Sequence, residues 1–283
     1  MTGVAAFDPR ACTLGEGPLW HPERQQLFWF DINAKRLLSR VADTALEWQF
    51  DRHVSAAGWV DRDRLLVASE TDLFLFDMET GTSETLCPLE AEQIGTRSND
   101  GRADPWGGFW IGTMDKHAAP RAGAIYRFYK GELHPLIHDL TIPNAICFSP
   151  DRKYAYYTDT TTRQIMRQRL KAEGWPTGPA EVFVDLRDRG LNPDGAVVDA
   201  EGCLWNAQWG ASRVARYSPD GRELMHVDMP ATQMTCPSFG GPDFATLYAT
   251  SAQEGIDLPS PEQGQTHATP VAHRGLPEYR VIL

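Results

Sequence analysis

One short segment recurs six times along the chain and constrains the fold more than any other feature of the sequence. Each copy is an apolar or aromatic run that directly follows a turn rich in Pro, Asp or Gly, and most copies are followed by a further β-like run. The copies occupy residues 27–31, 65–69, 109–113, 155–159, 204–208 and 247–251. They begin 38 to 49 residues apart. A period of about 40 to 50 residues, with four short strands per repeat, is typical of propeller blades.

The repeat therefore predicts an all-β fold, a single six-bladed β-propeller that occupies residues 1–283 as one domain. We expect N- and C-terminal segments to close the ring, with residues 4–7 pairing beside a strand near residues 279–282. A β-sandwich or two small β domains are the alternative. These would need no fixed period and should show a linker, which the sequence lacks.

Charge and composition exclude several kinds of partner. The chain carries 27 Lys and Arg against 38 Asp and Glu, a formal net charge of −11, which disfavours binding to nucleic acid or to an anionic membrane. No apolar run is long enough to span a bilayer and the first ten residues lack signal-peptide features, so we expect a cytoplasmic protein, monomeric or weakly homo-oligomeric. Five widely spaced cysteines without a C-x-x-C pair predict buried apolar thiols rather than disulfides.

Equivalent positions of the repeat converge on the central channel of a propeller. Counting back 10 or 11 residues from each aromatic run reaches Glu16, Asn99, Asn144, Asp194 and Cys236, with Val54 or Ser55 from the second repeat. Four of these six positions carry carboxylates or carboxamides, which together form an oxygen-rich site suited to a hard divalent cation. Each Asn-Asp-Gly or Pro-Asp-Gly taken alone is also a common turn. Their recurrence in phase with the repeat favours the cation site.

Several motifs occur in a fixed order over residues 14–252, and together they resemble the senescence marker protein 30/gluconolactonase/luciferin-regenerating enzyme family. The motifs are LGEGPLW at 14–20, RSNDGRADP at 97–105, GTM at 112–114, PNA at 143–145, PDG at 193–195, DAEG at 199–202, LW at 204–205, FGG at 239–241 and LYAT at 247–250.

The resemblance implies a hydrolase of carboxylic ester bonds that acts on a small-molecule sugar lactone. It implies one divalent cation, held by Glu16, Asn144 and Asp194, with Ca²⁺ favoured and Zn²⁺, Mn²⁺ or Mg²⁺ as alternatives. It further implies that Arg97 and Asn99 contact the lactone. The repeat reaches Glu16, Asn99, Asn144 and Asp194 independently, whereas Arg97 rests on the resemblance alone.

In such a hydrolase the cation polarises the lactone carbonyl, and we expect Asp194 to act as the general base toward the attacking water. Two alternatives remain. One is a metal-dependent esterase or phosphotriesterase on the same propeller, and the other is a non-enzymatic calcium-binding propeller.

The segment that follows GTM departs from the acidic pattern of many family members. It reads Asp115-Lys116-His117 and continues to Arg121. The segment is interpreted either as a solvated surface loop or as a lid. In a lid, its cations and a substrate-binding His117 would favour a lactone that bears an anionic group.

Overall fold

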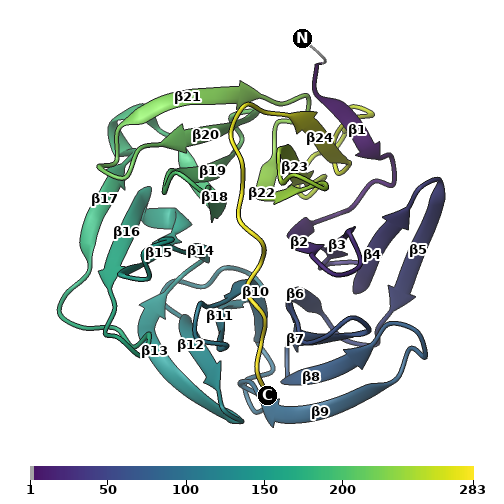
Figure 1. Cartoon of the computed structure of the whole chain (residues 1–283), viewed down its shortest axis with the longest axis vertical. Coiled ribbons are helices and arrows are strands. Elements are labelled where there is room, and N and C mark those ends of the chain that lie inside the picture. The colour runs from purple at the N-terminus through teal and green to yellow at the C-terminus, as the bar shows by residue number, and fades with distance from the viewer. Residues whose placement is uncertain (1–2) are drawn as a thin grey trace.

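Six four-stranded antiparallel sheets surround one axis in the computed structural model, which describes residues 3–283 (Figure 1). This arrangement confirms the predicted six-bladed β-propeller. The strands are joined by short loops and two short 3-10 helices, η1 (Thr160–Thr162) and η2 (Arg187–Arg189). Over the described residues, no helix has the length and apolar character that crossing a membrane requires.

Each blade begins at the channel and proceeds outward. Blades one to three comprise β2 (Gly15–His21), β3 (Gln26–Asp31), β4 (Arg36–Val41) and β5 (Thr44–Gln49); β6 (Val54–Trp59), β7 (Arg64–Ser69), β8 (Asp72–Asp77) and β9 (Ser83–Pro88); and β10 (Thr96–Ala103), β11 (Phe109–Asp115), β12 (Gly123–Tyr129) and β13 (Glu132–Leu140). Blades four to six comprise β14 (Pro143–Phe148), β15 (Tyr154–Asp159), β16 (Gln164–Arg169) and β17 (Glu181–Asp185); β18 (Asn192–Val198), β19 (Leu204–Trp209), β20 (Arg213–Tyr217) and β21 (Glu223–Asp228); and β22 (Met234–Gly240), β23 (Thr246–Ser251), β24 (Thr266–Pro270) and β1 (Ala5–Asp8).

The six recurrent apolar runs form the second strand of every blade, namely β3, β7, β11, β15, β19 and β23. These strands are buried almost throughout, because a blade is covered on both faces by its neighbours. The outermost strand β5, in contrast, alternates between exposed and half-buried residues. Continuous apolar runs and alternating runs therefore correspond to inner and outer positions within a blade.

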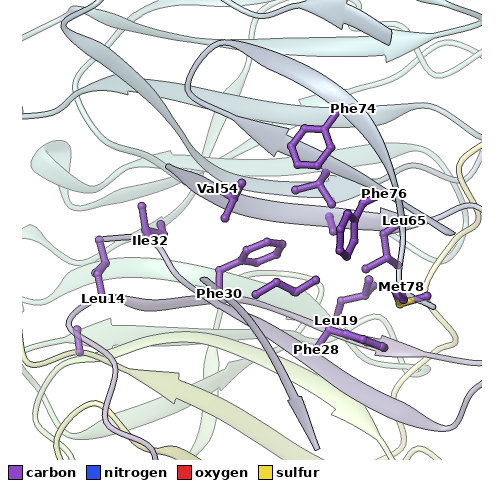
Figure 2. Packing of buried hydrophobic residues seen from close by; sticks show 14 residues of the cluster. Leu14, Leu19, Phe28, Phe30, Ile32, Val54, Leu65, Phe74, Phe76 and Met78 are labelled. Atoms are coloured by element: carbon purple, nitrogen blue, oxygen red, sulfur yellow. The ribbon is translucent and has the colours of Figure 1, made fainter. Parts of the chain in front are cut away.

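Aromatic side chains fill the space between adjacent blades. Figure 2 shows Phe28 and Phe30 of β3 facing Phe74 and Phe76 of β8 across the contact between blades one and two, with Leu65 of β7 beside them. All five are buried. The burial of such large apolar side chains between every pair of blades is the main favourable contribution to the stability of the ring.

The N-terminal strand closes the ring, as predicted, but the prediction that it pairs near residues 279–282 is wrong. Strand β1 pairs with β24, and Ala5 lies opposite Ala268. The segment Thr266–Pro270 is short and mostly polar, so its sequence lacks the apolar pattern that marks the second strand of each blade. Edge pairing needs only backbone donors and acceptors, which explains why a segment without that pattern can serve as the partner.

The C-terminal segment that was expected to pair with the N-terminus instead crosses the face of the ring, as the yellow tail in Figure 1 shows. Val281 donates its backbone N–H to Trp59 O (2.9 Å), and Ile282 donates to Gly107 O (2.8 Å). The side chain of Val281 is fully buried. Glu278 forms an ion pair with Arg102, which also donates to the Ala196 carbonyl (3.2 Å). The tail thus joins blades two, three and five at one end of the channel.

Asp8 connects the closing strand to the first blade. Its buried carboxylate accepts hydrogen bonds from Arg10 Nε (2.9 Å) and Arg40 Nε (3.1 Å). Replacing Asp8 by Ala removes the carboxylate that these two arginines share, and we expect this to cost about 2 kcal/mol of unfolding free energy and several degrees of Tm. The exposed Asp43→Ala on the β4–β5 turn is the control and should change Tm little. Thermal denaturation measures both, and equal Tm values would contradict the role of Asp8.

Candidate functional site

Every innermost strand contains a register shift at the same place. In β2 it falls between Glu16 and Leu19, in β14 between Asn144 and Cys147, and in β18 it begins at Pro193. The other three innermost strands have the same irregularity. Because a β-bulge bends its strand and redirects a side chain, the six bulges turn equivalent residues toward the axis. This geometry explains why counting along the repeat locates the polar residues of the channel.

Two glycines beside the predicted site residues are required by close packing. A Cβ atom on Gly17 would lie 2.3 Å from Ser55 O in the next blade, and Gly17 also has a φ of +54°. A Cβ atom on Gly195 would lie 2.4 Å from Cys236 Sγ. Both glycines lie within innermost strands rather than in turns. The interpretation of Pro193–Gly195 as a simple turn is therefore wrong, since the glycine allows two blades to approach each other.

A cavity of about 370 Å³ opens at the end of the channel opposite the C-terminal tail. It has the size and mixed polar and apolar lining of a small-molecule site. Its walls come from innermost strands and from loops that join the second and third strands. The lining residues are Leu14, Glu16, Arg97, Asn99, Met114, Lys116, His117, Ala118, Ile142, Asn144, Thr160, Thr161, Asn192, Asp194, Trp209 and Glu254. All six site residues predicted from the sequence are among them, and their roles remain predictions.

A chain of hydrogen bonds links the predicted residues across blades three, four and five. Arg97 Nη1 donates to Asn99 Oδ1 (2.7 Å), and Asn99 Nδ2 donates to Asn144 Oδ1 (3.0 Å). Asn144 Nδ2 in turn donates to Thr160 Oγ1 (3.0 Å), whose hydroxyl donates to Pro193 O (2.8 Å). Each amide is thereby held in one orientation, with the Asn144 oxygen still able to accept a second interaction.

The two predicted carboxylates are buried and have few hydrogen-bond partners among the described residues. Glu16 Oε2 accepts the Gly17 N–H (3.0 Å), whereas the buried Asp194 Oδ1 has no hydrogen-bond partner among residues 3–283. Burial and the negative charge of Asp100 raise the pKa of Glu16 to about 8. Burial, followed by the charge of Glu16, raises the pKa of Asp194 well above its usual range. Two buried carboxylates near an amide oxygen form a donor set that fits a hard divalent cation.

Asp100 is a buried carboxyl group that the sequence argument did not assign to the site. It lies in the bulge of β10, and its Oδ2 accepts the backbone N–H of Ile146 (2.7 Å) in the next blade. Burial raises its pKa to about 6, and Arg102 partly offsets that effect. The Asn-Asp-Gly motif contained the signal, because a bulge presents two successive residues where a regular strand presents one.

Glu254 was also missed, because it lies in the irregular segment between β23 and β24, outside the repeat pattern. Its carboxylate reaches the cavity and accepts a hydrogen bond from Asn33 Nδ2 (2.8 Å). Trp209, at the end of β19, provides an aromatic wall. Neither residue occupies the repeat position that identified the other site residues.

The segment after β11 borders the cavity over part of its length. Asp115 Oδ1 accepts the backbone N–H groups of His117 (2.7 Å) and Ala119 (3.2 Å), which orders the start of the loop. Lys116 and His117 line the cavity, whereas Arg121 lies away from it and pairs with Asp139 (3.2 Å). Only the first part of this segment is placed to contact a ligand.

A second group of potential metal ligands, Asp199, Glu201 and His273, lies outside the cavity. Arg216 pairs with Asp199 (2.8 Å) and with Glu201 (3.0 Å), and Trp205 Nε1 donates to Asp199 (2.9 Å). This group is therefore already balanced by protein charges and hydrogen bonds, in contrast to Glu16 and Asp194.

Comparison with known proteins gives consistent matches over nearly the whole chain. A family profile described as SMP-30/Gluconolactonase/LRE-like region matches residues 14–253. A putative sugar lactone lactonase from Rhizobium meliloti (strain 1021) is 39% identical, covering 97% of this chain and 97% of that protein. A 6-deoxy-6-sulfogluconolactonase from Pseudomonas putida is 36% identical, covering 85% of this chain and 84% of that protein.

Solved structures show the same fold. The crystal structure of a calcium-binding protein, regucalcin, from Agrobacterium tumefaciens strain C58 superposes with a TM-score of 0.97 at 38% identity. The match covers 100% of this chain and 98% of that chain. The arrangement of blades is thus shared along the whole length.

The raised pKa of Glu16 predicts how the stability of the cation-free protein depends on pH. The unfolded chain loses the Glu16 proton near the ordinary pKa of 4.5, whereas the folded protein keeps it until about pH 8. The folded state therefore binds the extra proton in this window, and its stability should fall as pH rises from 4.5 to 8. Glu16→Gln should flatten that dependence, while the exposed Glu84→Gln should not. Urea denaturation of chelator-treated protein across this pH range measures the free energy of unfolding. If that free energy depends on pH equally in wild type and in Glu16→Gln, the raised pKa of Glu16 is refuted.

Proposed function

Because the chain belongs to the SMP-30/gluconolactonase/LRE-like family, we propose that it is a hydrolase that opens the ester ring of a sugar lactone with the help of a bound divalent cation. Two relatives that are 36% and 39% identical over most of their length are named as lactonases, which supports hydrolysis of this bond type. The observation that carries the cation dependence is the buried Asp194 Oδ1, which has no hydrogen-bond partner within the described chain.

Glu16, Asn144 and Asp194 are the proposed ligands. They supply two carboxylates and one amide oxygen, and water can complete the coordination of a hard cation. Ca²⁺ suits these ligands best, and the structurally similar regucalcin is described as calcium-binding. Mg²⁺, Mn²⁺ and Zn²⁺ can use the same oxygens. A bound cation would act as a Lewis acid toward a carbonyl oxygen and would lower the pKa of bound water.

Asp194 is the proposed general base. A carboxylate has two oxygens, so one can bind the cation while the other accepts the proton of the attacking water. The water must attack the lactone carbonyl within a restricted geometry, which requires the substrate to be held against this carboxylate. After ring opening, the proton on Asp194 can pass to the leaving alkoxide, which returns the carboxylate to its starting state.

Arg97 and Asn99 are proposed to hold the substrate. The Arg97 guanidinium is almost completely buried and bonds through Nη1 to Asn99 and to the Ser98 carbonyl (2.9 Å), so its position is fixed before a ligand arrives. Its remaining N–H groups can donate to ring or hydroxyl oxygens of a sugar lactone. His117, exposed at the rim, is proposed to contact the far side of the substrate. Such preorganisation lowers the entropic cost of reaching the reactive geometry.

Two other functions would use the same cation site. An aryl esterase or phosphotriesterase would prefer a different electrophile, and a calcium-binding protein would bind the cation without turnover. A panel of aldonolactones, aryl esters and phosphotriesters, assayed by pH indicator with cation-loaded protein, separates these functions. Fastest turnover of an aldonolactone supports the proposal, whereas turnover of only the other esters, or of none, refutes it.

Asp194→Asn tests the general base. The substituted amide keeps an oxygen for the cation but cannot accept the proton, so kcat should fall at least about 100-fold. Calorimetric titration with Ca²⁺ should still show binding to the variant. Asp188→Asn, an exposed substitution in η2, is the matched control and should retain activity. Wild-type kcat in an Asp194→Asn protein that binds the cation would rule out the base assignment.

Removal of the cation tests whether lactone turnover depends on a bound divalent cation. Protein stripped with a chelator should lose lactone turnover, and Ca²⁺, Mg²⁺, Mn²⁺ or Zn²⁺ added separately should restore it to different extents. Glu16→Gln removes one of two ligand charges and should weaken cation binding by about tenfold or more. Full activity of the stripped protein, verified as metal-free by elemental analysis, would contradict cation dependence.

A further inference from the structure

The cavity is lined by three groups that can carry positive charge, Arg97, Lys116 and His117. Arg97 is deeply buried, and this burial lowers the pKa of its guanidinium, an effect that the nearby charge of Glu254 partly offsets. His117 is exposed. Lys116 lies at the rim of the cavity. If its ammonium has no carboxylate partner, the rim attracts an anionic substituent on a substrate, and if it is paired, that attraction is weakened.

Lys116 is held by groups outside the cavity. Its ammonium forms an ion pair with Glu70 Oε2 and donates to Ile94 O (2.8 Å). Its side chain is 27% exposed and that of Glu70 only 13%, so water screens the pair weakly. The ammonium of Lys116 is therefore held at Glu70, which follows the second strand of blade two, although the lysine lines the cavity.

Glu70 is itself fixed in place. It follows β7 directly, and its Oε1 accepts the backbone N–H of His53 (2.9 Å) and lies 3.1 Å from His53 Nδ1. Burial alone would raise the pKa of Glu70, but the hydrogen bonds from Lys116 and His53 outweigh it and lower the pKa to about 2. The carboxylate is thus anionic at all physiological pH values and remains paired with the lysine.

The charges around the cavity balance in three sets. Glu16 and Asp194 would offset a bound divalent cation, Glu254 lies on the cavity wall and attracts Arg97, and Glu70 forms an ion pair with Lys116. Without Glu70 the rim would carry one uncompensated positive charge at the edge of the substrate site. Such a charge attracts an anionic ligand and has little effect on a neutral one.

We propose that Glu70 is a specificity-determining residue that neutralises Lys116 and so makes the cavity select uncharged sugar lactones over lactones with an anionic substituent. This inference rests on the proposed lactonase function and deepens it. Glu70 acts through the position and charge of Lys116, since it does not line the cavity itself. The pair supplies a physical reason why the lysine in this loop does not by itself indicate an anionic substrate.

The test compares Glu70→Gln with wild type on gluconolactone and on 6-deoxy-6-sulfogluconolactone. The glutamine keeps the size and hydrogen-bonding oxygen but removes the charge. We expect wild type to favour gluconolactone. In the variant, kcat/KM for the sulfonated lactone should rise about tenfold through KM, and kcat/KM for gluconolactone should stay within about twofold. Added salt should reduce the gain, because it screens the released lysine charge.

Binding of inert ligands separates this inference from the lactonase proposal. Methyl glucoside and its 6-deoxy-6-sulfonate contain no lactone, so calorimetry with cation-loaded protein reports charge selectivity even if no lactone is hydrolysed. The ratio of their Kd values should shift about tenfold toward the sulfonate in Glu70→Gln and should return toward wild type in Glu70→Gln/Lys116→Met. The exposed Glu84→Gln is the control. Tighter binding of the sulfonate by wild type, or an unchanged ratio in Glu70→Gln, would overturn the inference.

Discussion

Six innermost strands converge on one axis, where neighbouring blades pack closely against each other. The close approaches at Gly17 and Gly195 show how tightly neighbouring blades meet there. The bulges admit polar side chains into this space, and buried polar groups need partners. Asn99 and Asn144 supply partners to each other across two blades. The interactions that join blades at the axis are consequently the same ones that orient the candidate site.

The two ends of this channel differ in how their buried charges are balanced. Near the C-terminal tail, Arg102 and Glu278 neutralise each other in a buried ion pair. At the cavity, burial raises the pKa of Glu16 and of Asp194, with a further contribution from the charge of Asp100 at Glu16 and from the charge of Glu16 at Asp194. Uncompensated buried charge is costly and is concentrated at functional sites. The cavity end is therefore the end of the channel at which we propose that a bound cation adds stability.

The fold was largely predictable because large apolar residues must fill the contacts between blades, and this requirement repeats with each blade. The axis residues were predictable for the same reason, since the bulges keep a constant spacing from the second strands. The partner of β1 was not predictable, because edge pairing through the backbone of Thr266–Pro270 places few demands on side chains. Asp100 and Glu254 were missed because one lies beside the repeat position and the other in an irregular segment.

The C-terminal tail also affects how small molecules enter and leave the cavity. The tail crosses one end of the channel, where Val281 is fully buried and Glu278 pairs with the buried Arg102, so we expect the cavity to be a blind pocket rather than a pore. Any small molecule must enter and depart through the same opening, so a departing molecule and an incoming one compete for a single passage. The loops around that opening, among them the segment that carries Lys116 and His117, therefore influence both the arrival and the escape of whatever the pocket holds.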